Sequence, residues 1–153
     1  MTDHIIAMPG PACFDLGTLH AVAREFGWTV GVADDLRELA AAQPYRRPIT
    51  VLFHRNAFGS CSWLDAVRLL RSALPEVRPV ACHGFPEPID WPALCDAGAF
   101  HALWLPLQEN EVRRSFGFVW EAEKRLAAPA TTQLIIPVQA CGVRARVMAP
   151  AAR

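Results

Sequence analysis

The fold of this chain is constrained most by a regular alternation between short apolar runs and segments with apolar residues at helical spacing. The five apolar runs, short enough for strands, are residues 4–8, 29–32, 49–53, 77–82 and 102–105. Each is followed by a segment with helical periodicity, at residues 15–26, 34–42, 63–74, 90–98 and 109–126. Strands that alternate with crossover helices pair in parallel. The pattern therefore predicts an α/β fold with a doubly wound five-stranded parallel sheet of order 2-1-3-4-5.

Residues at the expected helix ends support this division. Asp34 and Asp90 stand where N-caps are expected, because a carboxylate there can accept the free backbone N–H groups of the first turn. Gly27 and Gly98 stand at helix C-termini, where a left-handed residue commonly ends a helix. The boundaries of these helices are thus predicted independently of the apolar spacing.

The composition is that of one globular domain without an electrostatic partner. The 153 residues are 52% hydrophobic and 20% charged, and 15 basic and 15 acidic residues balance to a net charge of zero. Nucleic-acid binding is therefore not expected. The N-terminus lacks a basic start followed by a long apolar stretch, and no window is long and apolar enough for a membrane span. These features predict a cytoplasmic protein without membrane contact.

The cysteines and histidines do not predict a metal site. Five cysteines lack a paired CxxC spacing, and we expect reduced, mostly buried thiols. Cys82 and His83, with His54, are the only tempting ligand set. Neighbouring residues on a strand point to opposite faces, which suits two tetrahedral ligands poorly. We therefore expect no metal and no cofactor.

In a doubly wound sheet of this order, the functional crevice lies at the carboxyl ends of the first and third strands. Here those ends are Met8-Pro9-Gly10 and Phe53-His54-Arg55-Asn56. Any chemistry of this fold should therefore depend on these two short segments and on the ends of the neighbouring strands.

With this arrangement of strands and helices, the chain resembles the receiver domain of bacterial response regulators. The resemblance covers about residues 4–126 and includes Ala97-Gly98-Ala99, followed by Pro106. It implies a flavodoxin-like fold and a role in two-component signal transduction. Receivers carry an acidic pair after strand one, a phosphoacceptor aspartate after strand three, a Ser or Thr ending strand four, and Lys-Pro ending strand five.

The residues that perform phosphoryl transfer in receivers are replaced in this chain. Pro106 matches, as does Asn56 two residues beyond the acceptor position. The acidic pair, the acceptor, the hydroxyl residue and the lysine fall, in that order, on Pro9 and Gly10, His54, His83 or Gly84, and Leu105. The resemblance also implies a cis peptide bond between Leu105 and Pro106.

These replacements decide the expected chemistry. Phosphorylation of a carboxylate needs Mg²⁺ held by carboxylates and a cation that neutralises the migrating group. Pro9 and Gly10 supply no carboxylate, Leu105 supplies no cation, and the only lysine is Lys124 on the last helix. We expect a hydrogen-bonded structural role for His54 rather than phosphohistidine. The chain is thus predicted to be a pseudo-receiver without enzymatic activity, which acts through protein contacts.

The partner surface implied by the family is the face formed by helix 4, strand 5 and helix 5, which mediates dimers and output contacts. We expect a signalling protein as partner and a homodimer. For Trp120, one of the candidates on this face, the alternative is that its side chain packs inward against Phe116. The exposed candidates on this face are Phe100, Trp104, Arg113, Arg114 and Trp120.

The chain after residue 128 lies outside the receiver pattern, so we divide it into a receiver-like domain, 1–128, and an extension, 129–153. Residues 131–138 and 142–148 are β-prone, and the segment carries three arginines and no acid. The extension is predicted as an extra edge strand, a tail or an interaction segment. We expect residues 134–138 to pair with a sheet edge or a second subunit.

Two other functions fit the same sequence. A small-molecule binder or enzyme on a flavodoxin-like fold would use the switch-point crevice with His54, Arg55 and His83. A DNA-associated regulator would use the basic extension, and its binding would depend steeply on salt.

Overall fold

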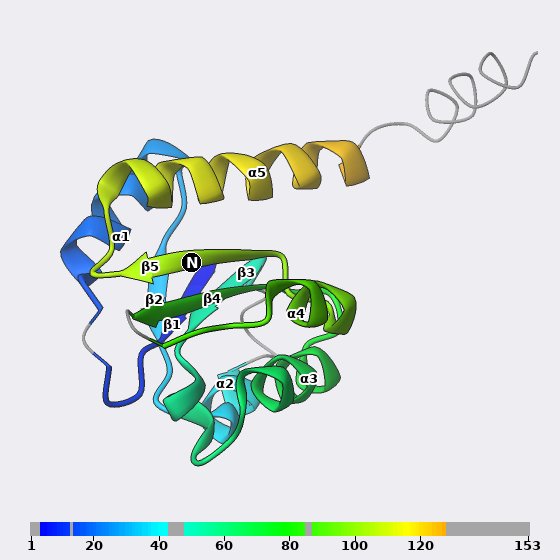
Figure 1. Ribbon diagram of the computed structural model, residues 1–153. Coiled ribbons are helices and arrows are strands. Elements are labelled where there is room, and N and C mark those ends of the chain that lie inside the picture. Colours follow the sequence, from blue (N-terminus) through cyan, green and yellow to red (C-terminus); the bar gives the residue numbers. More distant parts are fainter. Residues whose placement is uncertain (1–3, 13, 43–47, 85–86, 128–153) are drawn as a thin grey trace, which may run out of the picture. The chain divides into compact units, whose positions relative to one another are not determined.

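The computed structural model describes residues 4–12, 14–42, 48–84 and 87–127. The chain divides into two compact units, Met1–Val119 and Trp120–Arg153. The predicted boundary after residue 128 stays a prediction, and the β-prone extension lies outside the described residues. The elements (Figure 1) are β1 (Ile5–Met8), α1 (Leu16–Glu25), β2 (Val30–Val32), α2 (Leu36–Ala42), β3 (Thr50–Phe53), the 3₁₀ turn η1 (Arg55–Phe58), α3 (Trp63–Ala73), β4 (Arg78–Gly84), α4 (Trp91–Ala97), β5 (His101–Leu105) and α5 (Glu109–Ala127).

The five strands form one parallel sheet in the order β2-β1-β3-β4-β5. This confirms the predicted flavodoxin-like α/β fold and strand order. The register pairs Met8 with Phe53 and His83 with Trp104, so the strand ends that carry the predicted site lie along one edge of the sheet. Winding reverses between β1 and β3, which places the switch point at Pro9 and His54.

Helices cover both faces of the sheet. In Figure 1, α1 and residues 109–119 of α5 lie on one face, and α2, α3 and α4 lie on the other. On the first face the sheet packs against Leu19 of α1 and Phe116 of α5. On the second it packs against Leu39, Leu70 and Leu94 of the three helices. Apolar strands buried on both faces are what parallel sheets require, and they explain the continuous apolar runs in the sequence.

The helix ends follow the sequence signals with one correction. Asp90 accepts the Ala93 N–H at 3.2 Å, and Gly98 ends α4 in the left-handed conformation, as predicted. For α2 the expected cap was Asp34, but Asp35 accepts the Glu38 N–H at 2.8 Å. The Asp34 N–H instead donates to the Glu38 carboxylate at 2.9 Å. The helix therefore begins one residue later than Asp34 would set it.

Two further expectations can be compared with the structure. The Leu105–Pro106 peptide bond is cis, as predicted. The thiols are less buried than expected: of the three cysteines in the described ranges, Cys82 is buried, Cys61 is half-buried and Cys95 is exposed. Burial raises the pKa of the Cys82 thiol well above its usual value. Within the same ranges, no helix is both long and apolar enough to cross a membrane.

Candidate functional site

The turn after β1 rests directly on the backbone of η1. The His54 N–H donates to the Met8 carbonyl at 3.0 Å, which ties the ends of β3 and β1 together. Gly10 adopts a positive φ of 58°, and a Cβ at this position would lie 2.7 Å from the Ala57 nitrogen and 2.9 Å from its Cα. Because both atoms belong to the backbone, no side chain fits at Gly10 unless the turn moves. Gly10, which the resemblance to receivers assigns to the second position of the acidic pair, therefore has no room for a side chain.

His54, at the acceptor position, is a buried and hydrogen-bonded residue. Its side chain caps η1: Nδ1 accepts the Asn56 N–H at 3.2 Å, which leaves the proton on Nε2. Nε2 lies 3.4 Å from a carboxylate oxygen of Glu87. Its ring packs edge-to-face on Trp63, with centroids 5.3 Å apart. Both ring nitrogens are thus engaged within the chain.

Glu87 is a site residue that sequence reasoning missed. Its carboxylate accepts the Arg55 Nε–H at 2.7 Å, and Arg55 also donates to the Cys61 carbonyl at 3.2 Å. Burial alone would raise the pKa of Glu87, but the hydrogen bond and charge of Arg55, together with the contact from His54, lower it below its usual value. The available signal was its position, since Glu87 is the only acid between Gly84 and the Asp90 cap.

The Glu87 carboxylate is therefore held by a guanidinium and an imidazole. A divalent cation would have to displace both partners of Glu87 to bind there. Among the residues that the structure describes, no group of three or more His, Cys, Asp or Glu side chains could hold a metal ion.

His83 lies beside this cluster, at the end of β4. It is 5% exposed and stands opposite Trp104 in the sheet register, with ring centroids 4.5 Å apart. Its other neighbour is Trp63, whose ring centroid lies 6.2 Å away. Among the described residues, His83 Nδ1 and Trp63 Nε1 are buried without a hydrogen-bond partner. Burial lowers the pKa of His83, and Glu87 partly opposes this shift.

Leu105 faces away from these histidines. It pairs in register with Gly84, but its side chain packs with the cluster beneath α1 and α5, whereas Trp63 belongs to the cluster on the opposite face. The structure thus brings all the predicted positions to one edge of the sheet but not into one contact group. A cationic side chain does not stand at the end of β5, where receivers have lysine.

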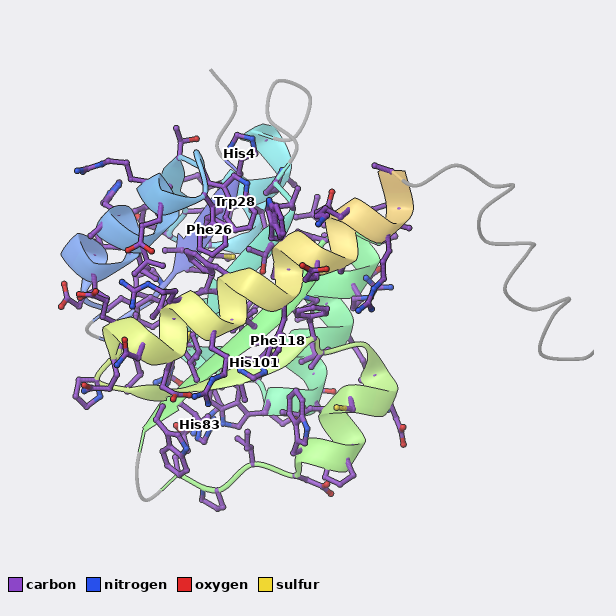
Figure 2. The ribbon with its side chains drawn as sticks, turned by 90° about the horizontal axis from the view of Figure 1, so that it is seen from above. His4, Phe26, Trp28, His83, His101 and Phe118 are labelled. Carbon is purple, nitrogen blue, oxygen red and sulfur yellow. The ribbon has the colours of Figure 1, made fainter. Side chains whose placement is uncertain are left out.

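The aromatic candidates of the predicted interaction surface differ in exposure. Trp104 is 58% exposed on the edge strand β5. Phe118, which was not predicted, is 49% exposed and packs edge-to-face on His101 at 5.5 Å (Figure 2). Phe100 was expected to be exposed but is half-buried, because the Arg78 guanidinium covers its ring at 5.7 Å. Trp120, in the second unit, is 41% exposed, and the Lys124 ammonium lies 4.2 Å from its ring centroid.

The two arginine candidates are paired within the chain. Arg113 donates to both carboxylate oxygens of Glu25 at 2.8 Å and also contacts Glu109 and Asn110, which joins α5 to α1. Hydrogen bonds to Glu25 and Glu109 raise the pKa of Arg113 above its usual value. Arg114 is exposed and lies 3.4 Å from Glu111. Arg114 is therefore the more accessible of the two.

Comparisons with known proteins give matches in structure only. Neither protein-family models nor curated protein sequences match the chain. The receiver domain of the TMAO respiratory system response regulator TorR superposes with a TM-score of 0.62 at 22% identity, over 78% of this chain and 98% of that chain. A putative response regulator from Chloroflexus aurantiacus gives 0.57 at 15% identity, over 77% and 98%.

A third match is to part of a longer protein. NtrX from Brucella abortus, in a structure with ADP, gives a TM-score of 0.63 at 17% identity and covers 96% of this chain. The present chain spans 31% of that NtrX chain. At these identities the likeness shows the fold alone, so this chain has the fold of response regulator receiver domains.

Proposed function

We propose that this chain is a non-phosphorylatable receiver-like signalling module that acts through protein contacts in a bacterial regulatory pathway. The observation that carries the proposal is the closed turn at Gly10. A Mg²⁺ ion in such a pocket requires carboxylates after the first strand, and the Ala57 backbone occupies the space that one such side chain would need. Without the ion and a cation on β5, the charge of a migrating phosphoryl group has no partner.

The edge as a whole supports an inert pocket. Glu87 is already neutralised by Arg55 and His54, and both nitrogens of His54 are engaged. A phosphoryl group on His54 would have to displace either the η1 cap or the contact with Glu87. The module thus has no catalytic role of its own in this proposal, and its signal depends on what it binds.

We infer that the partner surface is the α4-β5-α5 face and that the partner is a second copy of the chain. Trp104 and Phe118 leave large apolar side chains exposed on this face, and β5 is an edge strand. Exposed aromatic residues near the centre of a face are typical anchors of protein interfaces. Arg114 supplies an exposed charge beside them.

The dimer is tested by light scattering coupled to size-exclusion chromatography. Trp104→Glu places a charge at the proposed anchor and should convert a dimer into a monomer. Val32→Glu is the matched control, because Val32 is a 45% exposed apolar residue on β2, the opposite edge strand. We expect this control to remain dimeric. A monomeric wild-type chain, or equal masses for the two variants, would contradict the proposed surface.

The structure bears on only one of the two alternative functions. An enzyme or binder using His54, Arg55 and His83 gains little support, because Glu87 holds the first two side chains. A small-molecule function would instead use another cleft, described below. The DNA-associated alternative depends on the arginines of the extension, which lie outside the described residues, so it stays a prediction.

A further inference from the structure

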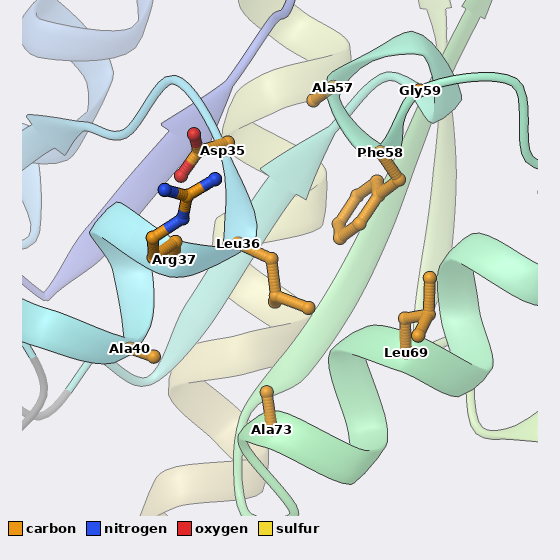
Figure 3. A pocket seen from close by; sticks show the side chains of 9 residues that line it. All are labelled: Asp35, Leu36, Arg37, Ala40, Ala57, Phe58, Gly59, Leu69 and Ala73. Atoms are coloured by element: carbon orange, nitrogen blue, oxygen red, sulfur yellow. The ribbon is translucent and has the colours of Figure 1, made fainter.

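A groove of about 570 Å³ lies between α2 and α3 and is closed at one end by η1 (Figure 3). Its volume lies within the range of small-molecule sites. Most of its lining is apolar: Leu36 and Ala40 of α2 face Leu69 and Ala73 of α3, with Phe58 between them. Leu69 is 40% exposed, and Leu36 and Phe58 pack against the buried core. An apolar ligand in the groove would therefore contact side chains that already pack against the core on this face of the sheet.

The groove carries one charge of each sign. Asp35 and Arg37 both line it (Figure 3). Asp35 Oδ1 accepts the Glu38 N–H at 2.8 Å, which fixes the carboxylate in place. Arg37 is exposed and has no ion-pair partner within the described part of the chain. A groove lined by one acid and one base suits a ligand that carries both an ammonium and a carboxylate.

We propose that this groove binds an apolar α-amino acid and that its occupancy is relayed to the exposed Trp104. The carboxylate of the ligand pairs with Arg37, its ammonium pairs with Asp35, and its side chain lies against Leu36, Phe58 and Leu69. Binding of the amino acid does not depend on the proposed function. The relay does rest on the proposed function, because Trp104 is the anchor of the proposed partner surface.

A continuous row of ring contacts joins the groove to that surface. Phe58 packs edge-to-face on Phe53 at 5.7 Å, and Phe53 packs on Trp63 at 5.9 Å. Trp63 contacts His83 at 6.2 Å, and His83 contacts Trp104 at 4.5 Å. Close-packed rings transmit a displacement because they leave little room for independent movement. A ligand that moves Phe58 therefore changes the packing of Trp63 and Trp104.

The proposal is tested by titrating the full chain with L-phenylalanine and recording NMR spectra. The methyl groups of Leu36 and Leu69 report the groove, and the indole N–H groups of Trp63 and Trp104 report the relay. We expect both sets of signals to shift with one saturation curve. N-acetyl-L-phenylalanine lacks the ammonium and L-phenylalaninamide lacks the carboxylate, so each should bind about threefold to fivefold more weakly, as expected for one exposed ion pair.

Three variants locate the site. Arg37→Gln should weaken binding of L-phenylalanine by the same factor as removal of its carboxylate. Ala40→Leu should weaken binding, because the larger side chain narrows the groove. The matched control is Arg68→Gln, which removes a 64% exposed arginine on α3 that does not line the groove. This control should bind like the wild-type chain.

Each outcome decides one part of the proposal. The absence of saturable shifts at Leu36 and Leu69, or an affinity that neither Arg37→Gln nor Ala40→Leu changes, overturns the site. Binding that leaves the Trp63 and Trp104 signals unchanged overturns the relay. These spectra require neither a dimer nor Mg²⁺, so failure here leaves the proposed function intact, and a monomeric chain leaves the amino-acid site intact.

Discussion

At the residue scale, the end of β1 is defined by the approach of two backbones. Gly10 touches the η1 turn so closely that a single added carbon would meet Ala57. On the other side of the turn, His54 caps η1 and contacts Glu87. An acid placed at Gly10 would not by itself create a metal site, because the Ala57 backbone occupies the space that its side chain would need.

A pair of alanine variants separates two effects on stability at Gly10, namely the close packing of the turn and its left-handed backbone conformation. Gly27 has a similar positive φ of 73°, but a Cβ there meets nothing within 4 Å. Gly27→Ala should cost about 1 kcal/mol from left-handed strain alone. Gly10→Ala adds a clash with backbone and should cost about 2–4 kcal/mol. Urea unfolding measures both, and equal losses would mean that the turn yields readily to a side chain.

The burial of His83 predicts a pH dependence of stability. Its pKa lies below the ordinary value of 6.5 in the folded chain, so the unfolded chain binds the proton more readily. The free energy of unfolding should therefore decrease as the pH falls below 6.5 and level off below the folded pKa. His83→Gln should flatten this slope. An NMR titration that gives His83 a pKa at or above 6.5 would rule the explanation out.

At the element scale, periodicity predicted the strands and helices because each one buries a regular face. The 3₁₀ turn η1 was missed, since four residues cannot display a helical period. Glu87 was missed for a related reason: its role depends on the approach of Arg55 and His54 from another loop, which no local pattern records. The cap of α2 was expected at Asp34 and not at Asp35, because two neighbouring carboxylates cannot be distinguished as caps by sequence alone.

The start of α4 provides a test of an element that the sequence did predict. Asp90→Ala removes the side chain that accepts the Ala93 N–H and should cost about 1 kcal/mol. Asp96→Ala is the matched control, because it removes the same group from the last turn of the same helix, where a negative charge is not favoured. We expect this control to be neutral or slightly stabilising in chemical unfolding. A reversed order would remove the capping explanation.

At the scale of the whole molecule, the sequence predicts the fold more fully than it predicts the site. The strand order followed from the sequence because a parallel sheet has few ways to connect its strands. The predicted site positions lie along one edge of the sheet, but the close contact at Gly10 joins two loops 46 residues apart, from Gly10 to Asn56. The groove between α2 and α3 likewise arises from small residues on separate elements, and no pattern in the sequence indicates it.

The extension is tested by deletion of residues 130–153. If it pairs with a second subunit, the deletion should lower the number of subunits that light scattering measures. If it pairs with its own sheet, the deletion should lower the urea midpoint while the number of subunits stays the same. One of these losses is expected, because the β-prone segment would otherwise be an unpaired apolar strand. A deletion variant with the same number of subunits and the same midpoint would show that the prediction is wrong.

The central claim is that this receiver fold cannot accept a phosphoryl group. The most direct measurement adds Mg²⁺ with beryllofluoride, and separately with acetyl phosphate, and follows amide NMR signals and intact mass. The account predicts an unchanged mass and unchanged signals at Gly10, Asn56 and Gly84, because the turn that should hold the ion is closed. Saturable Mg²⁺-dependent shifts at these residues, or a stable phosphoryl adduct on His54, would contradict it.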